Sequence, residues 1–313
     1  MDDVFYKSTL KTGAMFTGYY RYKDVFQIQL SSEKQSSIYD GNFMDIEYND
    51  KYRMINLNSE EKKNVYGQGY GHLDFLKELI ALLYICTNQH CELYDNDGNV
   101  RPGPQQKISG FTKTNGHQLR KCDARILARM NSCQDFVELQ SQTDLFLDKY
   151  FQLDTTSRTR INTSLFLLQN MRKIMLSSIS MGIVGLISAI ENLVDFNGER
   201  VGFKPTRCQH CNQLSYSVTK RFNDFMSEHS EEHFIEKYKV NNYYYIENDF
   251  MNKKASKLIK EFYSKRSKIT HAGDILEIDR ILSSFPMHEV RLFNEIETYV
   301  RIALFSYILH YEK

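Results

Sequence analysis

The pattern of apolar and polar residues changes character near residue 130. Before that point the chain holds short runs rich in β-forming residues, and polar turn residues separate them. Such runs predict strands, which we expect over residues 14–22, 25–30, 43–48 and 52–57. A longer apolar stretch at residues 73–86 predicts a helix in the same part of the chain.

After residue 130, apolar residues recur at helical spacing through most of the sequence. The spacing predicts helices over residues 134–152, 162–193, 216–227, 249–270 and 289–311. We therefore expect an α+β fold, in which a β-rich α+β N-terminal domain (residues 1–133) precedes an all-α domain (residues 134–313). Because no Pro-rich linker marks the border, its position follows only from the change in pattern.

Residues 174–190 carry no charge and lie between Lys173 and Glu191. Seventeen residues that include four serines and two glycines are a short and polar membrane span, so the stretch favours a buried core helix. Its small residues recur four apart, which predicts a closely packed neighbouring helix. These are Ser178 with Gly182, and Gly185 with Ala189.

The composition is that of a soluble globular protein, with 42% hydrophobic and 25% charged residues. The formal net charge of +1 gives no overall attraction to nucleic acid, so any affinity for RNA must come from a local basic patch. The six cysteines are scattered, and the first residues lack the apolar core of a signal peptide. We expect a reduced, cytoplasmic protein that does not enter a membrane.

The most basic stretch of the chain, residues 253–268, carries six lysines and Arg266 against the single acid Glu261. Its apolar residues recur at helical spacing, and a step of four from Phe262 reaches Arg266. A helix that buries this face places Arg266 among apolar contacts, where it needs an anionic partner or a ligand. The alternative is a solvated lysine-rich helix whose arginine reaches the surface.

Four residues separate Arg266 from His271, and Gly273 can end the helix just beyond the histidine. An imidazole moves protons near neutral pH, and a guanidinium binds a phosphate through two hydrogen bonds. Together the two side chains suffice for RNA cleavage without a metal ion, because the nucleophile is the 2′-hydroxyl of the substrate.

Four segments, in this order and spacing, resemble the HEPN superfamily of all-helical ribonucleases and toxins, and within it the ApeA-like group of bacterial anti-phage defence. The resemblance covers roughly residues 160–310 and rests on four pieces. They are Ser-Ala-Ile-Glu-Asn-Leu at 188–193, Cys-Gln-His-Cys at 208–211, Ser-Val-Thr-Lys-Arg at 217–221 and Tyr-Ser-Lys-Arg-Ser-Lys-Ile-Thr-His at 263–271.

The resemblance implies a HEPN-type helical bundle that forms a homodimer, in which Arg266 and His271 of both subunits meet and cut RNA without a metal or cofactor. It implies the role of a toxin or abortive-infection effector. Glu191 matches the acidic residue on the preceding long helix, whose neighbours then include the helix with Arg266. We expect RNA to contact the side chains around the pair: Lys257, Lys265, Ser267 and Lys268.

Two features leave alternatives open. Ser267 follows the arginine where many active members have Asn, Asp or His, which favours a second interpretation: an inactive HEPN-like dimer that binds RNA or a protein. The side chains of Cys208, Cys211, His229 and His233 are of types that bind structural zinc, and a zinc-stabilised adaptor is a third interpretation. Otherwise the cysteines are reduced and order a loop, and the two histidines lie on a solvated helix face.

The N-terminal domain carries no motif that names a ligand. Resemblance to defence ribonucleases suggests that it senses an infection signal or restrains the nuclease. We therefore expect an activator that is either phage-derived or a small molecule.

Overall fold

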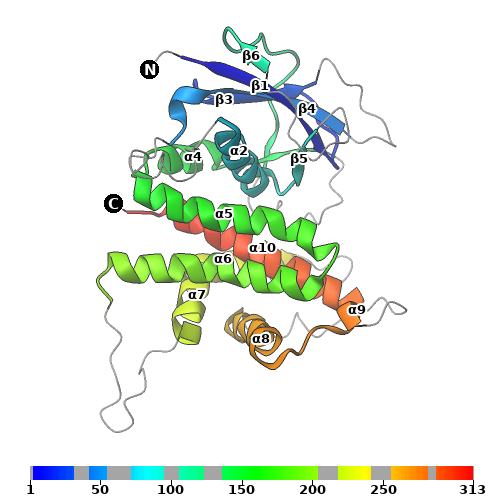
Figure 1. Cartoon of the computed structure of the whole chain (residues 1–313), viewed down its shortest axis with the longest axis vertical. Helices are drawn as coiled ribbons and strands as arrows, with labels where there is room; N and C mark the ends of the chain where they lie inside the picture. Colours follow the sequence, from blue (N-terminus) through cyan, green and yellow to red (C-terminus); the bar gives the residue numbers. More distant parts are fainter. Residues whose placement is uncertain are drawn as a thin grey trace, which may run out of the picture. The chain divides into compact units, whose positions relative to one another are not determined.

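The computed structural model describes residues 3–31, 42–54, 72–94, 106–122, 136–203, 218–240, 255–280 and 287–312. The chain divides into two units, Met1–Thr155 and Thr156–Lys313 (Figure 1). An antiparallel sheet with helices makes up the first unit, and helices make up the second. This confirms the α+β fold class.

In the first unit, the strands form a sheet in the order β2-β3-β4-β1-β5, and β6 pairs with the start of β1. All pairs in this sheet are antiparallel. The strands are β1 (Phe5–Thr12), β2 (Tyr19–Tyr22), β3 (Phe26–Leu30), β4 (Asn42–Asn49), β5 (Cys91–Leu93) and β6 (Gln106–Ile108). The sequence pattern identified β2, β3 and β4 but not β1. Of the strand expected over 52–57, only residues 52–54 are described, and Tyr52 ends a 3-10 turn.

Successive side chains on a strand point to opposite faces of the sheet. On one face Ile28, Ile46 and Tyr48 are buried. Helix α2 (His72–Thr87) packs here, since the Tyr48 ring meets the Phe75 ring edge-on with centroids 5.7 Å apart. The predicted helix over 73–86 is therefore confirmed, and its apolar residues supply the core of this unit.

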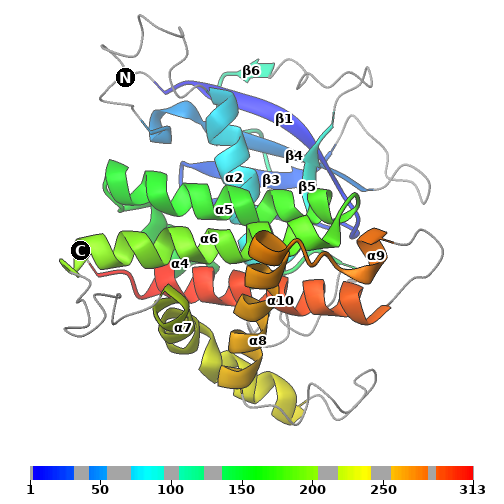
Figure 2. The same ribbon diagram turned by 60° about the horizontal axis from the view of Figure 1, so that its bottom comes forward.

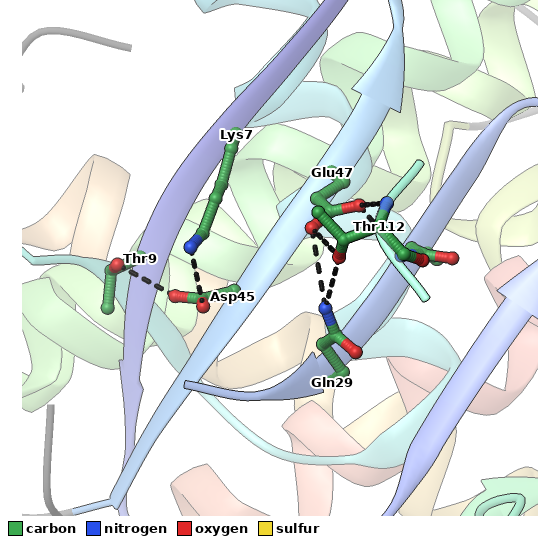
Figure 3. Close-up of polar contacts among 7 residues, drawn as sticks. Lys7, Thr9, Gln29, Asp45, Glu47 and Thr112 are labelled. Atoms are coloured by element: carbon green, nitrogen blue, oxygen red, sulfur yellow. Dashed lines mark hydrogen bonds and ion pairs between the residues drawn. The ribbon is translucent and has the colours of Figure 1, made fainter. Parts of the chain in front are cut away.

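The other face of the sheet carries buried polar side chains (Figure 3). Asp45 accepts a hydrogen bond from the Thr9 hydroxyl at 2.9 Å and pairs with the Lys7 ammonium at 3.1 Å. Glu47 is fully buried and accepts from both the amide (2.8 Å) and the hydroxyl of Thr112. A buried carboxylate needs such donors, so Glu47 fixes the Thr112 segment against the sheet.

The border between the units follows residue 155 rather than the expected residue 133. Strand β8 (Leu139–Gln140) pairs with β7 (Lys121–Cys122), so the helix expected over 134–152 begins only at α4 (Thr143–Phe151). The hydroxyl of Tyr20 in the sheet donates to Asp144 of α4 at 2.7 Å. These long-range contacts tie residues 136–151 to the first unit.

The second unit contains helices that cross one another at several angles. Figure 2 shows α6 between α5 and α10, and α7 and α8 pack against α6 and against each other. The elements are α5 (Thr155–Met175), α6 (Ile179–Arg200), α7 (Val218–Val240), α8 (Ala255–Ser267), the π-helical turn η2 (Lys268–Ala272), α9 (Glu277–Arg280) and α10 (Met287–Leu309).

The single helix expected over 162–193 is two helices, because α5 ends at Met175 and α6 begins at Ile179. The Ser178 hydroxyl accepts from the Met181 amide at 3.2 Å. The Asp279 carboxylate accepts from the amides of Ile179 (3.0 Å) and Ser180 (2.7 Å). These acceptors satisfy amides that no helical carbonyl reaches, so they define the start of α6.

Helix α6 is long and apolar enough to cross a membrane, and it alone is so among the described residues, with 61% of its most apolar window buried. Its glycines allow close packing, as predicted, and α8 is among the neighbours of α6 as expected, but the glycines themselves meet α10 and α5. A Cβ atom at Gly182 would lie 2.6 Å from Phe293 of α10, and one at Gly185 would lie 1.9 Å from Met171 of α5. Helix α8 meets α6 further along, at Glu191.

Candidate functional site

Helix α8 buries the apolar stripe that its sequence predicts. Leu258, Ile259 and Phe262 are at most 1% exposed. Arg266 lies one turn beyond Phe262 on the same stripe, and its side chain is only 19% exposed. The interpretation of α8 as a solvated helix with a surface arginine is therefore wrong.

The anionic partner that Arg266 needs is Glu191 on α6. The guanidinium Nη2 lies 2.8 Å from Glu191 Oε2, and the carboxylate is 14% exposed. Tyr263, one turn before Arg266, donates its hydroxyl to the other oxygen, Oε1, at 3.1 Å. Glu191 thus uses both oxygens to hold one cation and one neutral donor, which fixes the position of Arg266 relative to α6.

The environment keeps Tyr263 in its donor form. Burial raises the pKa of the Tyr263 phenol, and the negative charge of Glu191 raises it further. The ring also lies under the arginine, with the Arg266 guanidinium carbon 5.9 Å from its centroid. Arg266 Nε is buried and has no hydrogen-bond partner among the described residues. The guanidinium therefore retains donors beyond the one that Glu191 takes.

His271 lies in η2, the π-helical turn that extends α8. Residues five apart point about 140° away from each other around a regular α-helix. Here the Gly273 amide donates to the Lys268 carbonyl, which is the wider i→i+5 hydrogen bond of a π-turn. The imidazole is exposed to solvent.

Gly273 ends this turn as predicted, with a left-handed φ of 65° that glycine adopts without strain. The chain then returns to the start of α6, where the Leu276 amide donates to the Ser180 hydroxyl at 2.8 Å. Burial by itself would raise the pKa of Asp279, but hydrogen bonds from Ser178, Ile179 and Ser180 outweigh it and lower the pKa. The segment after His271 is thus anchored by an ionised carboxylate.

The remaining candidate residues lie along α8 and at the start of η2. Lys257, Lys265 and Lys268 are exposed, so their charges are available to an anionic ligand. Ser267 is half-buried at the junction of α8 and η2, and its side chain makes no capping hydrogen bond there. The structure thus brings Arg266 and Glu191 into direct contact and leaves the lysines and His271 facing solvent.

A second arginine and acid pair, which the sequence interpretation missed, lies one turn along α6. Arg221 of α7 pairs with Asp195 at 3.1 Å, with side-chain exposures of 21% and 57%. Glu191 and Asp195 are four residues apart, so they share a face of α6. The spacing of the two acids was a usable signal, because acids four residues apart on one helix can both pair with basic residues of helices that cross the same face.

The proposed zinc ligands fall mostly outside the described part of the chain, which omits Cys208, Cys211 and the His233 side chain. The expectation that His229 lies on a solvated helix face is wrong. Its ring packs against the rings of Phe225 and Tyr307, with centroids 4.6 Å and 5.3 Å away. Burial lowers the pKa of His229. Within the described ranges, no three His, Cys, Asp or Glu side chains gather as metal ligands.

Comparison with known protein families, with curated proteins and with solved structures finds no match.

Proposed function

We propose that the second unit is a HEPN-type, metal-independent endoribonuclease that acts as a toxin or anti-phage effector. The observation that carries this proposal is the Arg266–Glu191 contact of 2.8 Å, followed within one π-turn by an exposed histidine. A fixed guanidinium binds a phosphate at lower entropic cost than a free one. A solvent-facing imidazole can reach a substrate and exchange protons with it.

In the proposed reaction, the ribose 2′-oxygen attacks the adjacent phosphorus. The O2′–P bond forms and the P–O5′ bond breaks. One imidazole accepts the proton of the 2′-hydroxyl, and an imidazolium donates a proton to the leaving 5′-oxygen. Arg266 neutralises the charge that builds on the phosphorane. The products carry a 2′,3′-cyclic phosphate and a 5′-hydroxyl, and DNA is not cut because it lacks the nucleophile.

The reaction needs one proton acceptor and one proton donor, so two copies of His271 in a homodimer complete the site. Exposed apolar side chains close to the Leu276–Ser180 contact support an interface beside η2. Ile275 is 39% exposed and Met181 is 54% exposed, while Leu176, in the turn before α6, is 83% exposed. Exposed apolar side chains that form a patch mark protein–protein contact surfaces.

A second candidate function is a HEPN-like dimer that binds RNA or a protein and cuts nothing. The observation that favours it is the neutralisation of Arg266 by Glu191, since an ion-paired guanidinium attracts a phosphate less strongly than a free one. Ser267 beside the arginine fits the same interpretation.

The test is incubation of the purified full chain with total cellular RNA in excess EDTA, with analysis of the fragment ends. We expect cyclic-phosphate ends from the parental protein and intact RNA with His271→Ala or Arg266→Ala. His288→Ala and Arg160→Ala are matched controls, because His288 is an exposed histidine and Arg160 pairs with Glu199 on α6. Both controls should cleave at the parental rate.

Cleavage by His271→Ala or Arg266→Ala at the parental rate would refute the catalytic assignment. RNA that is bound but left intact by every protein would favour the binding module. The cellular role has its own readout: expression should arrest growth, and His271→Ala should relieve the arrest.

A further inference from the structure

A pocket of about 200 Å³ opens between the end of α6 and the start of α7. Val194, Val201 and Phe203 line it from α6 and the residues just beyond, and Phe225 lines it from α7. Val201 and Phe203 are 67% and 37% exposed. The pocket is therefore an apolar slot that opens at the surface, with room for one small ring system.

Arg221 lines this pocket, and an ion pair and a ring contact hold its flat guanidinium in place. Asp195 holds its Nη1 at 3.1 Å, and its guanidinium carbon lies 5.5 Å from the centre of the Phe203 ring. Within the described ranges, its buried Nε atom has no hydrogen-bond partner. Gly198 lies beside both side chains, because a Cβ there would be in ordinary contact with Arg221 Nη1 at 3.4 Å and with Phe203 Cβ at 3.8 Å.

We propose that this pocket binds one unstacked guanine base of an RNA strand, an inference that rests on the ribonuclease function proposed above. Single-stranded RNA is read by stacking splayed bases on aromatic rings and guanidinium planes, and the slot offers the rings of Phe203 and Phe225 and the guanidinium of Arg221. Asp224 and Glu228 at the rim repel phosphates, which leaves the base as the part of the nucleotide that enters.

The same carboxylates select the base. A carboxylate only accepts hydrogen bonds, and it binds best to two parallel donors. Guanine presents such a pair, at N1 and at its exocyclic amino group. Uracil presents a single donor between two carbonyl oxygens, which a carboxylate repels. Glu228 is the acceptor to test, because its side chain is 72% exposed and can adjust to the edge of a bound base.

The pocket is placed to serve the candidate catalytic site. Glu191 and Gly198 are seven residues apart on α6, a distance of about 10 Å along the helix axis. Helices α7 and α8, which supply Arg221 and Arg266, lie on the same side of α6 (Figure 1). A nucleotide near the one whose phosphate lies at Arg266 can therefore place its base in the pocket.

The experiment measures binding in the full-length His271→Ala protein, so that cleavage does not affect the result. The probes are fluorescent oligouridines that carry one guanosine, adenosine or cytidine, read by anisotropy. We expect the guanosine probe to bind about tenfold more tightly than oligouridine. Adding Glu228→Gln should remove this preference, and adding Phe203→Ala should weaken guanosine binding about tenfold through lost stacking.

Glu199→Gln is the control, because Glu199 is also exposed on α6 but does not line the pocket. It should keep the preference. Circular dichroism and the melting temperature show that each variant is folded. Equal affinity for all probes, or an unchanged preference in both Glu228→Gln and Phe203→Ala, overturns the pocket assignment even if the parental protein cleaves RNA. A guanosine preference that Glu228→Gln removes supports the pocket even if no protein cleaves.

Discussion

Replacement of Glu191 by Gln tests whether this carboxylate holds Arg266 in place. The substitution keeps the shape of the side chain and an acceptor for the Tyr263 hydroxyl, which lies 3.1 Å away. It removes the charge that pairs with Arg266 at 2.8 Å. The half-buried guanidinium then loses its charged partner, and no water fully replaces it.

The size of the effect follows from burial. Exposed ion pairs contribute about 0–1 kcal/mol to stability, and removing one partner of a fully buried pair costs about 3–5 kcal/mol. The side chains of Glu191 and Arg266 are 14% and 19% exposed. The cost of removing one partner of this pair therefore lies between the two limits, at about 2 kcal/mol. For a unit of this size such a loss lowers the Tm by roughly 4–8 °C.

A double-mutant cycle isolates the pair from other effects of each change. Glu191→Gln, Arg266→Gln and the double variant are unfolded in denaturant and followed by far-UV circular dichroism, since the chain has no tryptophan. We expect a coupling of about 1–2 kcal/mol. The cycle of Arg160 with Glu199, exposed by 45% and 64%, should give less than about 0.5 kcal/mol. Equal couplings in the two cycles would refute the reasoning.

Three further changes test other parts of the structure. Gly182→Ala places a Cβ 2.6 Å from buried Phe293 and should destabilise the second unit by about 1–3 kcal/mol, measured by denaturant unfolding; an unchanged midpoint would contradict this packing. Thr112→Ala removes a hydrogen-bond donor to buried Glu47 and should speed amide hydrogen exchange in residues 106–122. Exchange at the parental rate would argue against the conclusion that Glu47 fixes this segment against the sheet. Because burial lowers the pKa of His229 below 6.5, the unfolded chain binds this proton more readily. Stability should therefore be complete above about pH 6.5 and fall below it, and His229→Phe should flatten the dependence; an unaltered pH profile would count against the assignment.

The helices of the second unit were largely predictable because each buries one stripe at a period of 3.6 residues. The break after Met175 was not, since no Pro or Gly marks it. It depends on Asp279, which lies about 100 residues away and accepts from the first amides of α6. Strand β1 escaped prediction for a similar reason. The sequence alone suggests that Lys7 faces solvent, whereas in the structure it pairs with Asp45 on the neighbouring strand.

The candidate site was predictable in part. Spacing alone placed Arg266 on the buried stripe of α8 and required an anion beside it. Spacing did not identify Tyr263 as a second partner of Glu191, although it precedes Arg266 by three residues and so lies one turn away on α8. The π-turn was not predictable either, because it arises where α8 gives way to the left-handed Gly273 and the anchored segment beyond it.

Helix α6 explains how Arg266 and His271 keep a defined relationship although they do not contact each other. Glu191 holds Arg266 near the middle of α6, and Asp279 is bound to the first amides of the same helix. His271 lies between these two attachments, in a turn of five residues. Helix α6 in turn packs closely against α10 and α5 at Gly182 and Gly185, so the segment that carries His271 is attached at both ends to a tightly packed helix. The pair is therefore organised by contacts distant in sequence, and substitutions at Asp279 should affect His271 more than Arg266.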